Sequence, residues 1–159
     1  MSKEAFSFQD NITKSLKGMV DRANAMSSYL NKNLFKQYQK AQIARFESEN
    51  ETETGQWQPL NTKYLAQKKK KASKNSWPGA GNAIMIASGK LKDAATARSQ
   101  DYLKLVTNTS FTVSINTGAI PYAIYPGVMR PFMEFSQETE DEFSKGITDF
   151  ITKNLEPHL

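Results

Sequence analysis

Residues 102–116, YLKLVTNTSFTVSIN, decide the fold class, because they carry the clearest strand pattern in a chain whose other long patterns are helical. Apolar and polar residues alternate in both halves of the stretch, with Leu103 and Leu105 in the first half and Phe111, Val113 and Ile115 in the second. A tight turn over 107–109 would place Leu105 opposite Phe111 and Leu103 opposite Val113. The sequence therefore predicts an antiparallel β-hairpin with one buried face.

The segment after the hairpin is apolar but interrupted by proline. Residues 121–135 read PYAIYPGVMRPFMEF, which is too apolar for an ordinary solvent loop and too broken by proline for a central strand. Its first part, 121–125, predicts one further short strand, which Pro126 and Gly127 would end.

The last element is the best-marked helix of the chain. Ser136 is suited to cap its start, and acidic residues fill its first turns, where the helix dipole favours negative charge. Its apolar stripe consists of Phe143, Ile147, Phe150, Ile151 and Leu155.

The residues before the hairpin are mainly helical. Residues 9–30 repeat apolar residues at helical spacing, with Asp10 or Asn11 as the cap, and the pattern continues to Phe46. A break over 31–33 would give a helical pair; without it, one long helix results. The acidic stretch 47–56, ESENETETGQ, predicts a solvated loop.

Between that loop and the hairpin, the sequence predicts short elements. Asn61 or Thr62 would cap a short helix, and residues 72–82 would form a second loop. Residues 83–88, AIMIAS, would be a short buried run, followed by a short helix or turn.

These elements predict a single α+β domain over 1–159. It comprises a helical N-terminal region (1–46), a loop-rich basic insertion (47–82) and a hairpin with a C-terminal helix packed on the small antiparallel sheet (83–159). Only 38% of the residues are hydrophobic, which is below the usual share of about 45–50%. The core should therefore be modest and completed in part by a neighbouring subunit.

The residue types in the chain exclude most kinds of catalytic and metal-binding site. The chain has no cysteine and a single histidine, His158, so neither a thiolate site nor a histidine-based triad can be built. Phosphate-loop and nucleophile-elbow motifs are absent from the sequence. We expect no enzyme activity, no metal and no cofactor. No apolar run reaches the roughly 18 residues of a membrane span, and the N-terminus lacks the apolar region of a signal peptide, so we expect a soluble protein made in a cytoplasm.

Positive charge is concentrated in the first half of the chain. Residues 1–80 hold 14 lysines and arginines against 7 acidic residues. The densest cluster comprises Lys63, Lys68, Lys69, Lys70, Lys71 and Lys74. It would face DNA phosphates or an acidic partner, or else be the solvated end of a helix. Trp57 and Trp77, which flank this cluster, would either fix loops to the core or anchor a subunit interface.

The order of these motifs resembles a known family. GQWQPLN is followed by IMIASGKLKDA, then by the hairpin, by PYAIYPGVMRPFMEFS and by an acidic amphipathic helix. This order is similar to that of the virion morphogenesis proteins of tailed bacteriophages, the Mu protein G-like or tail completion proteins, within the head–tail joining and tail-terminator group. The residues that match the family pattern are Gly55, Trp57, Pro59, Leu60, Ile86, Ser88, Gly89, Leu91, Tyr122, Ala123, Gly127, Arg130, Pro131 and Phe132.

The resemblance implies a structural virion protein, assembled in the host cytoplasm, that forms a homo-oligomeric ring at the neck or tail. Six or twelve subunits fit phage symmetry, and the partners would be neighbouring neck or tail proteins, with packaged DNA in the lumen and no membrane. Candidate subunit-interface residues are Trp57, Tyr122, Tyr125, Arg130, Phe132, Glu138 and Glu142, with Arg130 facing a neighbour's carboxylates. The alternative is a small basic protein that binds nucleic acid without sequence preference.

Overall fold

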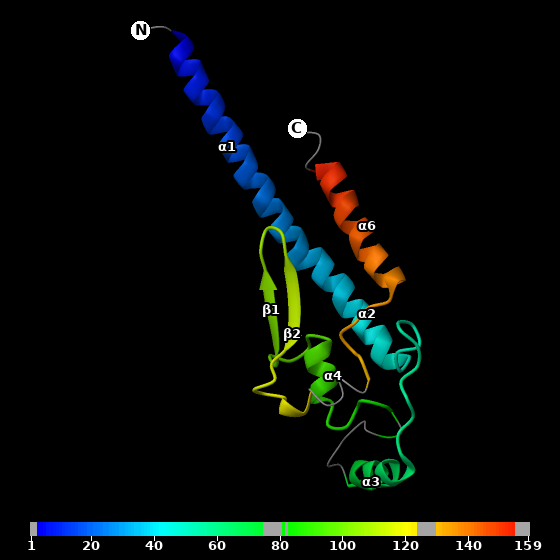
Figure 1. Cartoon of the computed structure of the whole chain (residues 1–159). Coiled ribbons are helices and arrows are strands. Elements are labelled where there is room, and N and C mark those ends of the chain that lie inside the picture. Colours follow the sequence, from blue (N-terminus) through cyan, green and yellow to red (C-terminus); the bar gives the residue numbers. More distant parts are fainter. Residues whose placement is uncertain (1–2, 75–80, 82, 124–129, 155–159) are drawn as a thin grey trace.

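A helical rod dominates the computed structural model, which describes residues 3–74, 81, 83–123 and 130–154 and, in α1, the side chains from Leu16 onward. The rod consists of α1 (Lys3–Tyr29), the π-helical turn η1 (Leu30–Leu34) and α2 (Phe35–Glu47), which follow one another without a break (Figure 1). The single long helix is therefore the correct one of the two sequence-based alternatives. The helix begins at Lys3, so the prediction that Asp10 or Asn11 caps it is wrong.

The η1 turn is where the other elements meet the rod. Its Asn31 Oδ1 accepts a hydrogen bond of 2.6 Å from Lys104 Nζ of the hairpin. Just before η1, the ring of Tyr29 stacks on Phe150 of the C-terminal helix, with 4.4 Å between ring centroids. A π-helical turn bonds residues i and i+5 instead of i and i+4, and here it coincides with contacts to the hairpin and to the C-terminal helix.

The hairpin forms as predicted, but with another register. Strands β1 (Tyr102–Val106) and β2 (Phe111–Ile115) pair antiparallel, with Leu105 opposite Thr112 and Lys104 opposite Val113. The turn is closed by a hydrogen bond from Thr107 N to the Ser110 carbonyl, so its loop is one residue shorter than expected. A shift of one residue turns every side chain of a strand to the opposite face.

The shift reverses which residues of β1 face the rod. Tyr102 stacks on Phe35 of α2, and Lys104 Nζ lies 4.0 Å from the centre of the Phe35 ring. Leu103 and Leu105, expected on the buried face, are 57% and 63% exposed. The lysine takes an inward position because its aliphatic stem and its charge both suit an aromatic ring.

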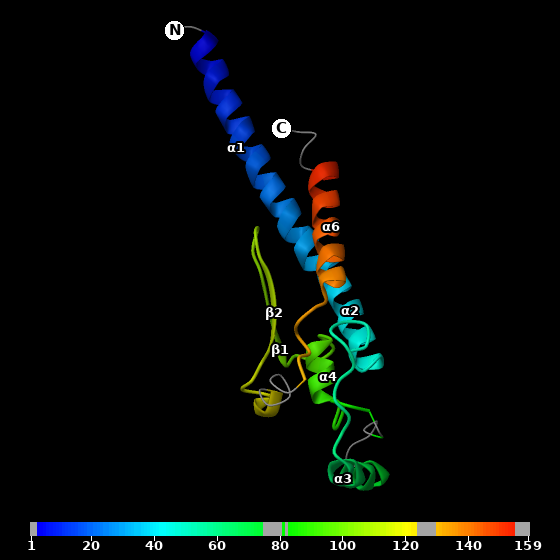
Figure 2. The same cartoon turned by 45° about the vertical axis from the view of Figure 1, so that its right-hand side comes forward.

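Helix α6 (Gln137–Asn154) follows Ser136, whose Oγ accepts a hydrogen bond from Thr139 N, as the predicted cap requires. Its packing partner differs from the prediction. Instead of covering the sheet, α6 runs along the rod, with Phe150 on Tyr29 (Figures 1 and 2). The prediction missed this because an apolar stripe shows that a helix is covered but not by which element.

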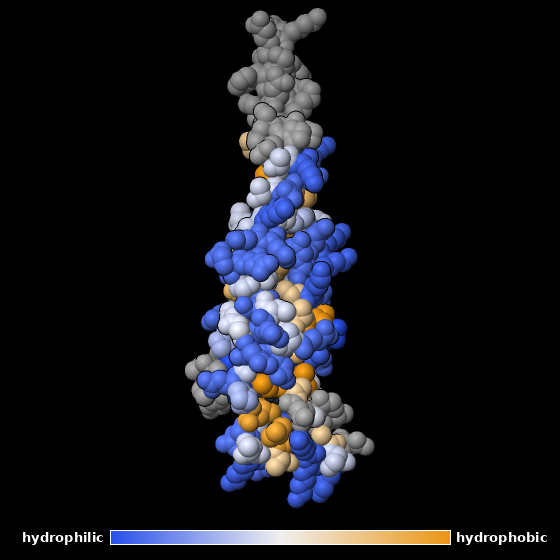
Figure 3. Space-filling model, turned by 90° about the vertical axis from the view of Figure 1, so that its right-hand side faces the viewer, coloured by the Kyte–Doolittle hydropathy of each residue, from blue (hydrophilic) through white to orange (hydrophobic). Residues whose placement is uncertain are grey.

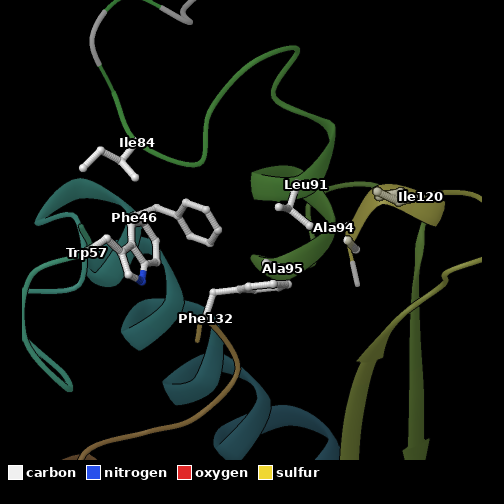
Figure 4. Close-up of a cluster of buried hydrophobic side chains, with 9 residues drawn as sticks. Phe46, Trp57, Ile84, Leu91, Ala94, Ala95, Ile120 and Phe132 are labelled. Atoms are coloured by element: carbon white, nitrogen blue, oxygen red, sulfur yellow. The ribbon is translucent and has the colours of Figure 1, made fainter. Parts of the chain in front are cut away.

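The main core lies around the C-terminal end of α2, at the lower end of the rod in Figure 1, and is drawn in Figure 4. Phe46 at the end of α2 meets Trp57 edge-on at 5.3 Å, and α4 (Lys90–Ala95) contributes Leu91, Ala94 and Ala95. The other buried members are Ile84, Ile120, Ala123 and Phe132. Residues 121–123 form the 3-10 turn η2 (Pro121–Ala123), so the predicted strand at 121–125 is wrong over its described part: Pro121 supplies no backbone donor for a strand pairing.

The acidic stretch 47–56 is folded against the core, so its prediction as a solvated loop is wrong for two of its carboxylates. Glu49 Oε1 accepts a hydrogen bond from Ile84 N at 2.8 Å. Glu53 accepts hydrogen bonds from Ser136 N at 2.9 Å and from Thr139 Oγ1 at 3.2 Å. Asn50, buried at a positive φ of 75°, donates to the Gly55 carbonyl at 2.6 Å and closes the turn. These carboxylates satisfy backbone donors elsewhere in the chain.

Candidate functional site

An apolar pocket of about 350 Å³ opens beside the core, between the helix α3 (Thr62–Ser73) and residues 85–91. Its apolar lining includes Leu60, Ile86 and Leu91, and its polar edge includes Tyr64, Tyr122 and Arg130. Tyr64 and Tyr122 are 42% and 45% exposed. Apolar surface gathers near the α3 end of the molecule, as Figure 3 shows.

The chain around the pocket is held by two hydrogen bonds between distant segments. Trp57 Nε1 donates to the Pro131 carbonyl at 3.0 Å, and Arg130 Nε donates to the Gln58 carbonyl at 3.1 Å. Residues 57–58 therefore donate one hydrogen bond to residues 130–131 and accept the other from them. These bonds fix the position of Arg130 at the pocket edge.

Helix α3 carries the lysine cluster. Asn61 caps it, as predicted, with its side-chain oxygen accepting from Lys63 N at 2.8 Å. The helix continues to Ser73, so the lysines lie on a helix longer than expected. Lys63, Lys69, Lys70, Lys71 and Lys74 are exposed.

Lys68 differs from its neighbours, because it is buried under the pocket. Its side chain is 1% exposed, and its Nζ donates a hydrogen bond to the Ala83 carbonyl. Burial lowers the pKa of the Lys68 ammonium group, and the nearby Glu49 partly offsets the effect. The prediction that Lys68 faces DNA or an acidic partner is therefore wrong for this side chain. Helical periodicity could have identified it, since Lys68 follows Tyr64 and Leu65 at i+4 and i+3.

The structure separates the predicted interface residues into three places. Tyr122 and Arg130 lie at the pocket. Trp57 and Phe132, both 4% exposed, are core residues, which for Trp57 is the loop-fixing alternative left open by the sequence. An interface role for these two side chains is wrong, because one chain already buries them. Glu138 and Glu142 are exposed on α6, in a groove with α2. Tyr125 and Trp77 lie outside the described residues.

Sequence reasoning missed a buried polar cluster beside this region. Arg45 and Glu53 form an ion pair of 3.6 Å, with side-chain exposures of 0% and 3%. Arg45 also donates to the Glu134 carbonyl through Nη2, and its guanidinium carbon lies 4.8 Å from the centre of the Phe135 ring. Burial lowers the pKa of Arg45, and Glu53 partly restores it. Arg45 and Glu53 are eight residues apart, but the turn between them follows no regular spacing rule, so only the surplus of charge in RFESENETE hinted at the pair.

The pocket suits binding better than chemistry. Its lining is apolar, with phenols and a guanidinium at the edge, which can hold an apolar side chain and a neighbouring acceptor. Within the described part of the chain, no three histidine, aspartate or glutamate side chains cluster closely enough to hold a metal ion. The same part contains no helix that combines the length and the apolar character needed to cross a membrane.

Comparison of the chain with protein-family models, with curated proteins and with solved structures gave no match.

Proposed function

We propose that this chain is a structural protein of a tailed-phage virion, which assembles into a ring at the neck or at the head-proximal end of the tail. One observation carries the proposal: the three sequence elements that resemble the tail completion family meet in one core. Trp57 of the first element bonds Pro131 of the third, and both segments pack around Leu91 of the second.

The surface of the single chain also supports assembly. Several large apolar side chains are more than half exposed in the single chain. Leu16, Met19 and Val20 lie on the rod, and Leu103 and Leu105 lie on the hairpin. Exposed apolar groups of this kind are typical of surfaces that a neighbour covers. A subunit of a ring has two such neighbours, through two different faces.

The proposed ring would have six or twelve subunits and would contact other neck or tail proteins. Tyr122 and Arg130 at the pocket, together with Glu138 and Glu142 on α6, remain its candidate interface residues. The exposed lysines of α3 are suited to touch packaged DNA as it passes, without reading its sequence. No catalytic role is assigned.

Electron microscopy tests the proposal directly. Antibody against this protein is applied to tailed virions of the source phage, and label is expected at the junction of head and tail. Native mass spectrometry of the purified protein should show a discrete oligomer of six or twelve subunits. Virions without label at that junction, and a protein that stays monomeric at all concentrations, would overturn the proposal.

A second candidate function, non-specific binding of nucleic acid, is favoured by the exposed lysines of α3, which are Lys63, Lys69, Lys70 and Lys71. We expect the isolated protein to bind random duplex DNA weakly at physiological salt, and the variant with Lys69, Lys70 and Lys71 changed to glutamine to bind less. Tight binding by an isolated monomer would favour this second function over the ring. The acidic α6 argues against it, since its carboxylates repel phosphate.

A further inference from the structure

The upper half of the rod carries an apolar stripe that the chain itself does not cover. Leu16, Met19 and Val20 are 58%, 56% and 57% exposed. Their spacing of three and four residues places them on one face of α1. The same stripe continues down the rod to Leu30 and Leu34, which are 5% and 6% exposed. The stripe is therefore buried where the hairpin and α6 reach it and uncovered beyond them.

A groove of complementary character lies at the other end of the same helix pair. Helix α6 lies close to the rod at Gly146, where an added Cβ would lie 2.8 Å from Tyr29 Oη. Toward its N-terminus, α6 and α2 leave a groove of about 590 Å³. Ala41, Ala44 and Phe143 line its floor, and the exposed Glu138 and Glu142 stand on its α6 rim.

The stripe of one chain cannot reach the groove of that chain. Met19 and Ala41 lie on one unbroken rod, so they are about 33 Å apart at the rise of roughly 1.5 Å per residue of an α-helix. An α1 stripe that occupies the groove must therefore come from a second copy of the chain. Docking of an amphipathic helix into a groove through residues at i, i+3 and i+4 is a recurrent mode of recognition.

Charge supports this pairing of surfaces. Lys17 and Arg22 flank the stripe on its two sides, with Asp21 beside Lys17. The groove is lined by the carboxylates of Glu138 and Glu142 on α6, by Glu53, which is paired with Arg45, and by the ammonium group of Lys40. The helix segment is thus net positive where the groove is net negative, which favours this partner over a like-charged one.

We infer that residues 16–23 of α1 in one copy dock into the α2–α6 groove of the next copy. The contact joins two different faces, so repetition of it produces a closed ring or a helical array. The inference rests on the proposed function, which it deepens by naming the two surfaces that meet.

Engineered disulfides test the contact, because the chain has no cysteine of its own. The double variant Met19→Cys with Ala41→Cys is oxidised with copper phenanthroline, and a ladder of covalent oligomers is expected on a denaturing gel. The distance along the rod excludes a bond within one chain. The matched control is Leu103→Cys with Ala41→Cys, since Leu103 is as exposed as Met19 but lies on the hairpin. It should give no ladder.

Two further variants make the outcome decisive. Lys17→Glu should slow cross-linking about 5-fold, because it places a negative charge against the carboxylates of the groove. Adding Glu142→Lys should restore the rate, because the two changes together reverse both charges of the pair and leave it attractive. Dimers formed by Met19→Cys alone, without a ladder from the double variant, would show a symmetric α1–α1 contact and overturn the inference. A ring seen by electron microscopy that does not cross-link would overturn the inference and leave the proposed function standing. A monomer at all concentrations would overturn both.

Discussion

Arg45 and Glu53 lie 3.6 Å apart with both side chains nearly inaccessible to solvent, and this ion pair joins three parts of the chain. Arg45 belongs to α2 and donates to the Glu134 carbonyl. Glu53 belongs to the acidic turn and accepts from the backbone of Ser136, immediately before α6. The pair therefore sets where α6 begins relative to the rod, and so shapes the groove between them.

Replacing Glu53 should destabilise the fold strongly. Glu53→Gln keeps the shape of the side chain but leaves the buried charge of Arg45 without its partner, which typically costs about 3–5 kcal/mol. Urea unfolding followed by circular dichroism measures the free energy. Glu51→Gln, an exposed position in the same turn, is the control and should change it by less than about 0.5 kcal/mol. Equal stabilities of the two variants would mean that Arg45 is balanced by other groups.

Trp57 tests the link between the first and third sequence elements. Trp57→Phe keeps much of the apolar bulk but removes the donor to the Pro131 carbonyl, so we expect a loss of about 1–3 kcal/mol. Trp57→Ala should lose about 3–5 kcal/mol, because it also leaves a cavity beside Phe46. Thermal and urea unfolding give both values. A Phe variant as stable as the wild type would show that the hydrogen bond contributes nothing net.

Local patterns in the sequence were enough to predict the α+β class, the hairpin and the cap at Ser136. They narrowed the first third of the chain to one long helix or a helical pair, and the cap of α3 to Asn61 or Thr62. Each depends on residues close together along the chain, whose side chains meet their own backbone or one stripe. The register of the hairpin was wrong because Lys104, polar by type, has an apolar stem that covers Phe35.

The parts that could not be predicted depend on contacts between distant segments. Of the candidate interface and partner-facing residues, Trp57 and Phe132 are buried in a core whose other members lie far away in the sequence, and Lys68 is buried under the pocket against Ala83. An aromatic ring or a lysine gives no sign by itself of whether a remote segment will cover it. The pocket edge, by contrast, contains Tyr122 and Arg130 as candidates that stay accessible.

Lys68 predicts a specific dependence of stability on pH. Burial lowers its pKa in the folded chain below the usual lysine value, so between those two values the unfolded chain binds more protons. The free energy of unfolding contributed by this group therefore rises with pH in that window. Lys68→Met removes this contribution, so the wild type should gain stability relative to the variant when the pH is raised from 7 to 10.

The comparison needs a lysine on the same helix that is exposed. Lys69→Met serves this purpose, and its stability relative to the wild type should be the same at both pH values. Urea unfolding at pH 7 and pH 10 provides all the differences. If the difference in stability between Lys68→Met and the wild type is also the same at pH 7 and pH 10, the buried ammonium group of Lys68 does not make stability depend on pH.

The register of the hairpin can be checked by stability alone. Leu105 is exposed, so Leu105→Thr should change the free energy of unfolding by less than about 0.5 kcal/mol. Phe111 meets both Phe35 and Tyr38 edge-on at 6.2 Å, so Phe111→Ala should lose about 2 kcal/mol. In the register expected from alternation, Leu105 and Phe111 would share the buried face. Similar losses in the two variants would then support that register instead.

Gly146 tests the close approach of α6 to the rod. In the interior of most helices, Gly→Ala stabilises by about 0.5–1 kcal/mol. At Gly146 the added methyl group would lie 2.8 Å from Tyr29 Oη and 3.3 Å from Gln37 Nε2, so either these side chains or α6 must shift, and we expect a loss of about 1–2 kcal/mol. Gly18→Ala is the matched control, because its nearest neighbour is Arg22 Nη1 at 3.6 Å, an ordinary contact, and it should show the usual gain. Tyr29→Phe removes the closest atom, so Gly146→Ala should be better tolerated in that background. If Gly146→Ala stabilises the wild type as Gly18→Ala does, the two helices do not pack at this point, and the groove that depends on their crossing would have a different shape.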